Sequence, residues 1–569
     1  MTPRQVCGES PAVVMSERSQ TVFYHARILV LALLTGVGTG GLALAFRGGV
    51  HGLQLLSSWL QAELGGFAWL TRLTMPALGG LVVGLLLYRY LRARSGHGVP
   101  VVIHSAAEDR PLDDLRMGAA AASSMITLGS GGSAGPEGPI VELGAVTGSY
   151  AWRWSRLEKH DIQVMMGCGA AAGMAAVFSA PIGGVMFVLE VVLRDFRIKT
   201  MAPVMLASVA ASAVNEWAFG LEPAIYLPSI PVAGPRLLLL ALPLAVLCAA
   251  LSVLYMRSSQ ALYERVNRWS VPVWVKPSLG GLAVGCIAAF VPQVQGVGYD
   301  HIEALVGASL PLLLVGIVAL AKLAATVLTL SSGCPGGAFA PALVMGAALG
   351  ACIGGAMGFD RAAAGLLGMA GMIAGTFQAP LCALIIMMKL GHYELGLIVP
   401  LMCVAALSAW IVQRLVPGNM YDLSLLRRGL DLGAARGVRV LLEGRRAAEI
   451  MRRPVATFCF NASLGSMLDV VSRSGQESYP VVSEQGDLLG VVNMPTIRHA
   501  LRTGSLDGLV LACDLLSPSP PVVHPDTELT EVWRLFQTCQ AAELLVAEAR
   551  PDGGTAAQLV GWIREGDIL

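Results

Sequence analysis

Apolar residues run in long uninterrupted stretches through most of the chain, with polar residues collected between them. A helix that crosses a bilayer needs about 17–25 predominantly apolar residues. Four stretches without Asp, Glu, Lys or Arg cover residues 28–46, 73–88, 237–256 and 395–412. Each is predicted to be a membrane-spanning helix.

Shorter apolar segments, interrupted by glycine or proline, lie between these stretches at residues 140–152, 182–193 and 340–357. Irregular backbone inside a membrane is tolerated only where it lines a cavity or packs against protein. We therefore expect these segments to be broken helices in the interior of the membrane region.

The pattern changes near residue 418, where the long apolar runs stop and charged residues become frequent. We predict a cytoplasmic N-terminal segment at 1–25, a membrane transport domain at 26–430, and a soluble tail at 431–569 of about one domain in size. Residues 1–25 lack the apolar core of a secretory signal, so the N-terminus is expected to be cytoplasmic.

Composition agrees with a protein that is mostly embedded in lipid. Of the 569 residues 55% are hydrophobic and 14% charged, and the mean hydropathy is +0.65. The net charge of +1 gives no indication of nucleic-acid binding. The 11 cysteines include no C-x-x-C pair, which favours buried structural thiols over a metal or redox site.

A glycine-rich sequence occurs twice, 202 positions apart: SGGSAGPEGP at residues 130–139 and SGCPGGAFAP at 332–341, each followed by Gly-Ala. A glycine turn with a proline near the first helical position exposes backbone N–H groups at the positive end of a helix, which attracts anions. Two such turns in a membrane chain predict an anion site between repeats.

A second duplication supports two structural halves. The sequence FSAPI at 178–182 recurs as FQAPL at 377–381, 199 positions later. The sequence alone does not show whether the halves are inverted. Small residues also pack membrane helices together, which is the alternative explanation for any single glycine.

Four motifs, in the same order along the chain, resemble those of the CLC family of chloride channels and proton/chloride antiporters. The family's G-[K/R]-E-G-P motif is matched by GPEGP at 135–139, and its G-x-F-x-P motif by GAFAP at 337–341. Its G-S-G-I-P motif has an altered counterpart in GHGVP at 96–100, and its late tyrosine is matched by Tyr421. Together the motifs cover about residues 25–430.

The resemblance implies an all-α polytopic membrane protein of broken, tilted helices in two inverted repeats. It implies a homodimer with one anion pathway per subunit, located in the plasma or inner membrane with both termini cytoplasmic. The small anion, chloride or a similar ion, would be held by helix-end amides and a tyrosine hydroxyl rather than by a full cation, which allows fast exit. The implied anion-binding residues are His97, Gly98, Val99, Gly138, Ala338, Phe339 and Tyr421.

Glu137 is the odd residue of the repeat, since its counterpart is Phe339. A carboxylate at the mouth of a helix can occupy the amide nest that an anion would use. While ionised it competes with the permeant ion, and protonation favours its release. Glu137 is therefore the predicted gate, although carboxylates at helix starts also serve as simple caps.

His97 and Pro136 depart from the family pattern. His97 stands in place of a serine whose hydroxyl faces the central anion, and its imidazole either donates to the anion or turns away. Pro136 stands where the family has lysine or arginine, so a weaker outer site is expected. Lys322 either supplies the missing charge or snorkels to the membrane surface.

Val191 occupies the position at which antiporters of the family carry a proton-transferring glutamate, while Glu190 matches the family's structural acid. Valine cannot carry a proton, which favours passive, channel-like conduction. Proton-coupled antiport remains the alternative, because some antiporters lack the inner acid. Lys389 stands where relatives commonly have an acidic residue, and its role is open.

The tail resembles a pair of CBS motifs at about 445–503 and 510–569, an α+β unit with glycine-bearing turns between short strands. CBS pairs often bind adenine nucleotides through a Thr or Ser and an Asp three residues later. Only Asp567 fits that pattern here. The tail is expected to be either a nucleotide-binding or simply a dimerising regulatory module.

Other classes fit less well. A CBS-regulated magnesium transporter needs clustered intramembrane carboxylates, and Glu137, Glu142 and Glu190 are too few. An enzyme would need a nucleophile with a base or a metal cluster, and the histidines form no such pattern. The chain is expected to be no enzyme and to require no cofactor or metal, with chloride as its permeant ion.

Overall fold

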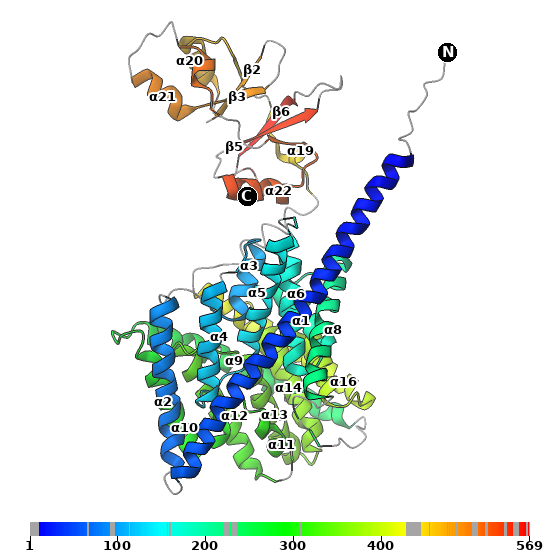
Figure 1. Ribbon diagram of the computed structural model, residues 1–569, viewed down its shortest axis with the longest axis vertical. Helices are drawn as coiled ribbons and strands as arrows, with labels where there is room; N and C mark the ends of the chain where they lie inside the picture. Colours follow the sequence, from blue (N-terminus) through cyan, green and yellow to red (C-terminus); the bar gives the residue numbers. More distant parts are fainter. Residues whose placement is uncertain are drawn as a thin grey trace. The chain divides into compact units, whose positions relative to one another are not determined.

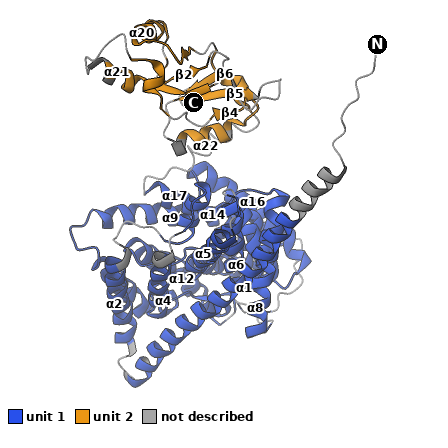
Figure 2. Cartoon of the chain, turned by 45° about the horizontal axis from the view of Figure 1, so that its top comes forward, with its two compact units in different colours: residues 1–430 blue, residues 431–569 orange. Residues whose placement is uncertain are grey.

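The computed structural model describes the chain outside residues 1–10, 65–67, 92–96, 113, 156, 159–160, 221–224, 226, 229–235, 308, 428–444, 454–455, 475, 477, 484–487, 503–509, 518–521, 540–542, 550–556, 565–566 and 568–569. Residues 1–430 and residues 431–569 form two compact units (Figure 2). The first is built of helices, and the second combines short strands with helices (Figure 1).

The helices of the first unit fall into two successive sets. The first set is α1 (Pro11–Leu64), α2 (Ala68–Leu86), the π-helical turn η2 (Leu87–Leu91), α3 (Val99–Ala107), α4 (Asp114–Gly129), α5 (Glu137–Ser155), α6 (Asp161–Phe178), α7 (Pro181–Phe187), the π-helical turn η3 (Val188–Val192) and α8 (Ile198–Phe219). The second is α9 (Leu237–Asn267), α10 (Lys276–Phe290), η4 (Pro292–Val294), α11 (Tyr299–Val306), α12 (Leu312–Ser331), α13 (Phe339–Ala356), α14 (Arg361–Phe377), α15 (Pro380–Leu390), η5 (Leu395–Leu397), α16 (Ile398–Leu415) and α17 (Met420–Leu426).

Eight helical spans in the described part are long and apolar enough to cross a membrane. The four predicted runs lie in α1, in α2 with η2, in α9, and in η5 with α16. The three broken segments lie mainly in α5, in α7 with η3, and in α13. The prediction of an all-α membrane architecture with broken helices is therefore confirmed.

The two glycine-rich turns meet at the centre of this unit. The Gly135 amide donates to the Gly337 carbonyl at 2.8 Å, and the Gly337 amide donates to the Gly135 carbonyl at 2.7 Å. Equivalent residues that bond reciprocally are related by a local twofold axis. The helices α5 and α13 begin after these turns and extend toward opposite ends of the unit (Figure 1), as inverted repeats require.

Glycines bring helix backbones into direct contact in both halves. A Cβ on Gly144 of α5 would lie 2.0 Å from the Gly169 carbonyl oxygen of α6. The counterpart in the second half is Gly346 of α13, where a Cβ would lie 2.4 Å from the Gly368 carbonyl oxygen of α14. This packing of small residues holds the helix pairs close together around the central turns.

The second unit contains two three-stranded sheets of the same topology. One has the order β1 (Phe458–Cys459), β2 (Ser478–Val482), β3 (Leu488–Asn493), and the other β4 (Val522–Val523), β5 (Glu543–Ala549), β6 (Ala557–Arg564). In each, the first pair is parallel and the second antiparallel. The accompanying helices are α19 (Ala447–Ile450), α20 (Leu464–Arg473), α21 (Met494–Arg502), η6 (Ala512–Leu515) and α22 (Leu529–Cys539). The predicted duplicated α+β tail is thus confirmed.

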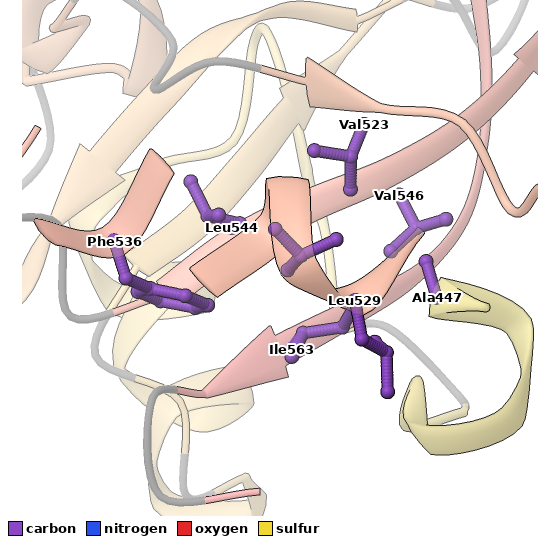
Figure 3. Packing of buried hydrophobic residues seen from close by; sticks show 8 residues of the cluster. Ala447, Val523, Leu529, Phe536, Leu544, Val546 and Ile563 are labelled. Carbon is purple, nitrogen blue, oxygen red and sulfur yellow. The ribbon is translucent and has the colours of Figure 1, made fainter. Parts of the chain in front are cut away.

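Each half of the second unit has its own hydrophobic core. Figure 3 shows the core of the second half, in which α22 and α19 cover the sheet β4-β5-β6. Its buried residues are Ala447, Val523, Leu529, Val532, Phe536, Leu544, Val546 and Ile563. The two halves are joined by Glu543, which accepts hydrogen bonds from the Ser478 amide at 3.1 Å and from Arg564 Nε at 2.9 Å.

Candidate anion pathway

A cavity of about 680 Å³ collects most of the predicted anion-binding residues. Its lining includes six of the seven: His97, Gly98, Val99, Gly138, Ala338 and Tyr421. The seventh, Phe339, is fully buried and does not line it. We call this space the Tyr421 cavity. It brings together the starts of α3, α5, α13 and α17, which lie far apart in the sequence.

Gly98 enters the cavity wall in a conformation that favours glycine, with φ of 81° immediately before α3. Its amide donates to Glu142 Oε2 of α5 at 2.6 Å. The single backbone donor of Gly98 is therefore already used, and the prediction that this amide binds an anion is not met in the structure. Glu142, only 1% exposed, was missed as a participant at this site.

Tyr421 is oriented by a capping box at the start of α17. Asn419 Oδ1 accepts hydrogen bonds from the amides of Tyr421 and Asp422, both at 2.9 Å, and Asp422 Oδ2 accepts from the Asn419 amide at 3.2 Å. Arg194 Nη2 holds the same aspartate at 2.7 Å. This box fixes the first turn of the helix, so that Tyr421 is held at the cavity wall.

Phe339 forms the centre of a buried aromatic cluster. Its ring centroid lies 5.2 Å from that of Phe377, 5.5 Å from that of Phe178, and 6.0 Å from that of Phe187. The Phe377 ring continues the cluster to Tyr421 at 5.0 Å. Phe178 and Phe377 are the repeated phenylalanines of the second duplication, so the repeat places an apolar wall on each side of Phe339.

The start of α13 directs backbone amides toward the Glu137 carboxylate. Ala338, which precedes Phe339, makes no capping hydrogen bond with its side chain, and the Ala340 amide contacts Glu137. The first N–H groups of a helix have no acceptor within the helix and carry partial positive charge. Ala338 lines the Tyr421 cavity, so this helix end is suited to receive an anion there.

Glu137 is fully buried at the first residue of α5. Its Oε2 lies against the paired glycine turns, because a Cβ on Gly135 or on Gly337 would lie 2.0 Å or 2.7 Å from it. The carboxylate therefore occupies the space between the two turns, which is where the sequence predicted an anion site. The side chain is folded inward rather than released toward an aqueous space.

Tyr299 holds the other carboxylate oxygen. Its hydroxyl donates to Glu137 Oε1 at 2.6 Å from the first position of α11. Sequence reasoning missed this residue, because it lies in no repeated motif. The available signal was the sequence GVGY at residues 296–299, in which Gly298 has φ of 91° and turns the chain abruptly into the helix.

A second cavity, of about 380 Å³, lies beside Tyr299, the residue that holds Glu137. It is lined by Pro136 and Tyr299 together with residues of α1 and α8, and we call it the Tyr299 cavity. Residues on either side of Glu137 therefore face different spaces: Pro136 faces the Tyr299 cavity and Gly138 the Tyr421 cavity. Glu137 itself is fully buried and is not among the lining residues of either cavity.

Lys322 does not supply charge to either cavity. It is fully buried in α12, and its Nζ donates to the carbonyl oxygens of Val294 at 3.0 Å and Gly296 at 2.9 Å. Both alternatives predicted for it, a vestibule charge and a snorkelling side chain, are wrong. Lys322 instead ties α12 to the loop that leads into Tyr299, a positioning role in the membrane interior.

The inner acid position is apolar. Val191 is fully buried within η3. The neighbouring Glu190 accepts hydrogen bonds from the amides of Leu381 at 3.1 Å and Cys382 at 2.8 Å, and thereby caps α15. This contact is the structural role that the resemblance implied for Glu190, and it links the two repeats.

Lys389, the counterpart of Glu190 in the second repeat, lies in the last turn of α15. A positive charge there complements the negative end of the helix dipole. This position gives the lysine a local role in stabilising α15.

In the tail, Asp567 is engaged by an arginine. It accepts hydrogen bonds from Arg452 Nε at 2.8 Å, from Arg452 Nη2, and from the Arg564 amide at 3.1 Å. Partial burial by itself would raise the pKa of the Asp567 carboxyl, but these hydrogen bonds and the two arginine charges lower it below its usual value. The group predicted to hold a ribose is therefore already paired in this structure.

Comparison with known proteins agrees with this geometry. The family model for voltage-gated chloride channels matches residues 79–413, and that for the CBS domain matches residues 447–503. Chloride channel protein CLC-e of Arabidopsis thaliana is 33% identical over 427 residues, which cover 67% of this chain and 59% of the relative. The voltage-gated ClC-type chloride channel ClcB of Escherichia coli O17:K52:H18 is 29% identical over 407 residues, covering 69% of this chain and 91% of the relative. The chain thus spans less than two thirds of CLC-e.

Two solved structures have the same fold. A slow cyanobacterial Cl−/H+ antiporter superposes with a TM-score of 0.66 at 21% identity, covering 70% of this chain and 97% of the other. A eukaryotic CLC transporter superposes with a TM-score of 0.65 at 20% identity, covering 96% of this chain and 98% of the other. Since the family model matches more than half of the sequence, this multi-pass membrane chain belongs to the voltage-gated chloride channel (CLC) family of anion transporters.

Proposed function

We propose that the protein moves chloride or a similar small anion between the Tyr421 cavity and the Tyr299 cavity, with Glu137 as the gate. The observation that carries this proposal is the position of the Glu137 carboxylate, buried beside the paired glycine turns, with its chain neighbours Pro136 and Gly138 lining the two cavities. An anion of similar size would occupy the same space when the side chain leaves. The amides at the start of α13 would then face the ion.

Passive, channel-like conduction is the form of transport that we propose. Its support is Val191, because a fully buried valine at the inner position neither binds nor releases a proton. The aromatic wall around Phe339 adds no titratable acid to that side of the gate. Protonation of Glu137 would then control opening without driving a coupled cycle.

Proton-coupled antiport is the second candidate, and Glu142 supports it. This buried carboxyl group lies on the same helix as Glu137, and its partner Gly98 lines the Tyr421 cavity. Glu142 could therefore pass protons to the Tyr421 cavity, which Val191 cannot do. A slow Cl−/H+ antiporter and a CLC-type fluoride/proton antiporter have the same fold, so this candidate is at least as well supported as passive conduction.

Chloride flux from liposomes, recorded together with proton movement under a membrane potential, tests both forms. Passive conduction predicts chloride efflux without proton movement against its gradient. Uphill proton movement would reject it in favour of antiport, and Glu142→Gln should then abolish proton movement while chloride flux persists. Absence of chloride flux, with or without magnesium uptake, would reject anion transport altogether.

Tyr299→Phe is expected to increase chloride flux. The substitution removes the 2.6 Å hydrogen bond that holds Glu137 in its buried position. Hydrogen bonds to charged groups contribute about 1.5–3 kcal/mol, so the released state should gain about tenfold to a hundredfold in population. Tyr255→Phe is the matched control, because Tyr255 is also fully buried but its hydroxyl has no hydrogen-bond partner in the described part of the chain. Equal fluxes in both variants would contradict the latch role of Tyr299.

We further propose that the protein works as a homodimer in a plasma or inner bacterial-type membrane, with both termini on the cytoplasmic side. Apolar side chains on α8 and α16 that face away from the unit support a lipid or subunit contact, among them Val209 at 54% exposed and Val399 at 59%. Native mass spectrometry from detergent distinguishes a dimer from a monomer.

For the tail we propose a regulatory CBS module in which an adenine nucleotide binds only after Arg452 leaves Asp567. The paired state of this carboxylate supports the proposal. We expect little or no heat when ATP, ADP or AMP is titrated into the full chain, and measurable binding to Arg452→Ala. Absence of heat with all three nucleotides in both proteins would leave the tail as a dimerising module.

A further inference from the structure

The Tyr299 cavity contains a guanidinium group that the gate does not use. Arg47 of α1 lines this cavity together with Pro136 and Tyr299, the two residues that adjoin Glu137 on this side. His51 and Asp300 also line it. Arg47 is thus a permanent positive charge in the space from which an anion would reach the gate.

Neutral groups hold the Arg47 side chain in place. Its Nη1 donates to Asn215 Oδ1 at 3.2 Å, and its guanidinium carbon lies 4.5 Å from the centre of the Phe219 ring. Asn215 is itself buried, and its Nδ2 donates to Ser179 Oγ at 2.7 Å. The arginine is therefore fixed in position by α8 without being neutralised.

No carboxylate in the described part of the chain forms an ion pair with Arg47. Asp300 lines the same cavity, but its carboxylate is not within ion-pair distance of Arg47. A fixed cation without an ion-pair partner raises the local concentration of anions in a partly enclosed space. Its remaining N–H groups can donate to a small anion while one donates to Asn215.

Pro136, next to Glu137 in the chain, suggests a purpose for the position of Arg47 in the Tyr299 cavity. Pro136 lines the same cavity and stands where the family motif has lysine or arginine, so the positive charge next to the gate is missing from the motif itself. Arg47 comes from a helix 89 positions earlier in the chain but faces the same space. A cation from α1 thus compensates for the one that the motif lacks.

We propose that Arg47 forms an anion-capture site in the Tyr299 cavity, which takes a small monovalent inorganic anion before it passes the gate. This inference rests on the proposed anion transport. The site lowers the chloride concentration needed for half-maximal flux and changes the maximal flux little. The positive charge of Arg47, rather than its contacts with α8, attracts the anion.

The test is chloride flux from liposomes containing the full chain, measured over a range of chloride concentrations. Arg47→Gln removes the charge, and we expect it to raise the half-saturating chloride concentration about fivefold, which corresponds to the attraction of two unit charges about 4 Å apart in water. Arg47→Gln combined with Pro136→Lys returns a cation to the motif position and should restore most of the lost affinity. Unchanged half-saturation in Arg47→Gln would overturn the proposal.

Arg414→Gln is the matched control, because Arg414 also stacks on an aromatic ring, with 5.6 Å to the centre of Trp410, but lines neither cavity. It should leave the half-saturating concentration unchanged, and an equal effect in both variants would count against a local site. If Arg47→Gln fails to fold, Asp300→Asn gives an independent answer. Removal of this negative charge from the same cavity should lower the half-saturating concentration, and no change would oppose the proposal.

The failure of this inference can be told apart from the failure of the proposed function. Wild-type protein that shows no chloride flux would reject anion transport as a whole. If the wild-type protein conducts chloride and Arg47→Gln shows the same chloride dependence of flux, only the capture site is rejected. A loss of maximal flux with unchanged half-saturation would assign Arg47 to helix packing and likewise reject it.

Discussion

Glu137→Gln is expected to raise chloride flux at neutral pH by about tenfold and to abolish most of its dependence on pH. The wild-type carboxylate is fully buried between the glycine turns and carries the charge that competes with the permeant anion. Glutamine has nearly the same shape but no charge, so it mimics the protonated side chain. The loss of one charge-assisted contact, about 1.5–3 kcal/mol, sets the size of the effect.

The direction of the pH effect follows from the same competition. In the wild-type protein, protonation of Glu137 removes the blocking charge, so flux should increase as pH falls. In Glu137→Gln the group no longer titrates, and the flux should stay high and level across that range. Efflux of chloride from liposomes buffered at several pH values measures both properties.

Glu303→Gln is a suitable control, because Glu303 is an exposed glutamate of α11 that lines none of the described cavities. It should reproduce the wild-type flux and pH response. If Glu137→Gln also behaved as wild type in both respects, the gating role of Glu137 would be refuted. A complete loss of flux in a folded variant would instead assign the carboxylate to conduction itself.

Gly169→Ala is expected to cause the largest loss of stability among single-methyl substitutions in the membrane domain. A Cβ at this position would lie 1.7 Å from the Gly144 carbonyl oxygen and 2.3 Å from its carbonyl carbon. Both atoms belong to helix backbone, so α5 and α6 must separate. Overpacking of this kind typically costs 1–3 kcal/mol and sometimes more, and we expect about 3 kcal/mol here.

Gly41→Ala also adds a single methyl group, but it is expected to leave the stability of the protein unchanged or to increase it. A Cβ on Gly41, in the middle of α1, meets nothing within 4 Å. Alanine stabilises a helix interior by about 0.5–1 kcal/mol relative to glycine. Thermal unfolding in detergent, followed by tryptophan fluorescence, should therefore show a lower midpoint for Gly169→Ala and an equal or higher one for Gly41→Ala. Equal midpoints would refute the close packing of α5 on α6.

The resemblance between the halves also explains how a charge-poor site can select anions. The two glycine turns bond to each other, so neither needs a side chain to hold it, and Glu137 is placed between them. One departure from symmetry at this point places Glu137 of the first half opposite Phe339 of the second. One half thus supplies the carboxylate that we propose as the gate, and the other supplies an apolar wall and the amides at the start of α13.

Much of this protein was determined by the sequence alone. Apolar runs without charge located four of the eight candidate spanning helices in the described part of the chain, because lipid excludes ionised side chains along such lengths. The doubled glycine turns predicted where the two halves meet, because only glycine permits backbone to approach backbone this closely. The alternating strands and turns of the tail likewise predicted its two sheets.

The tertiary structure decided which donors and charges are available at the site. Only it showed that the Gly98 amide is used by Glu142, that Tyr299 holds the gate, and that Arg47 rather than Lys322 brings positive charge to the Tyr299 cavity. The Gly98–Glu142 and Tyr299–Glu137 contacts join residues 44 and 162 positions apart, and Arg47 is held by Asn215, 168 positions away. Local patterns report periodicity and turn chemistry, whereas pairing across such separations depends on how the helices pack, and no local pattern records that.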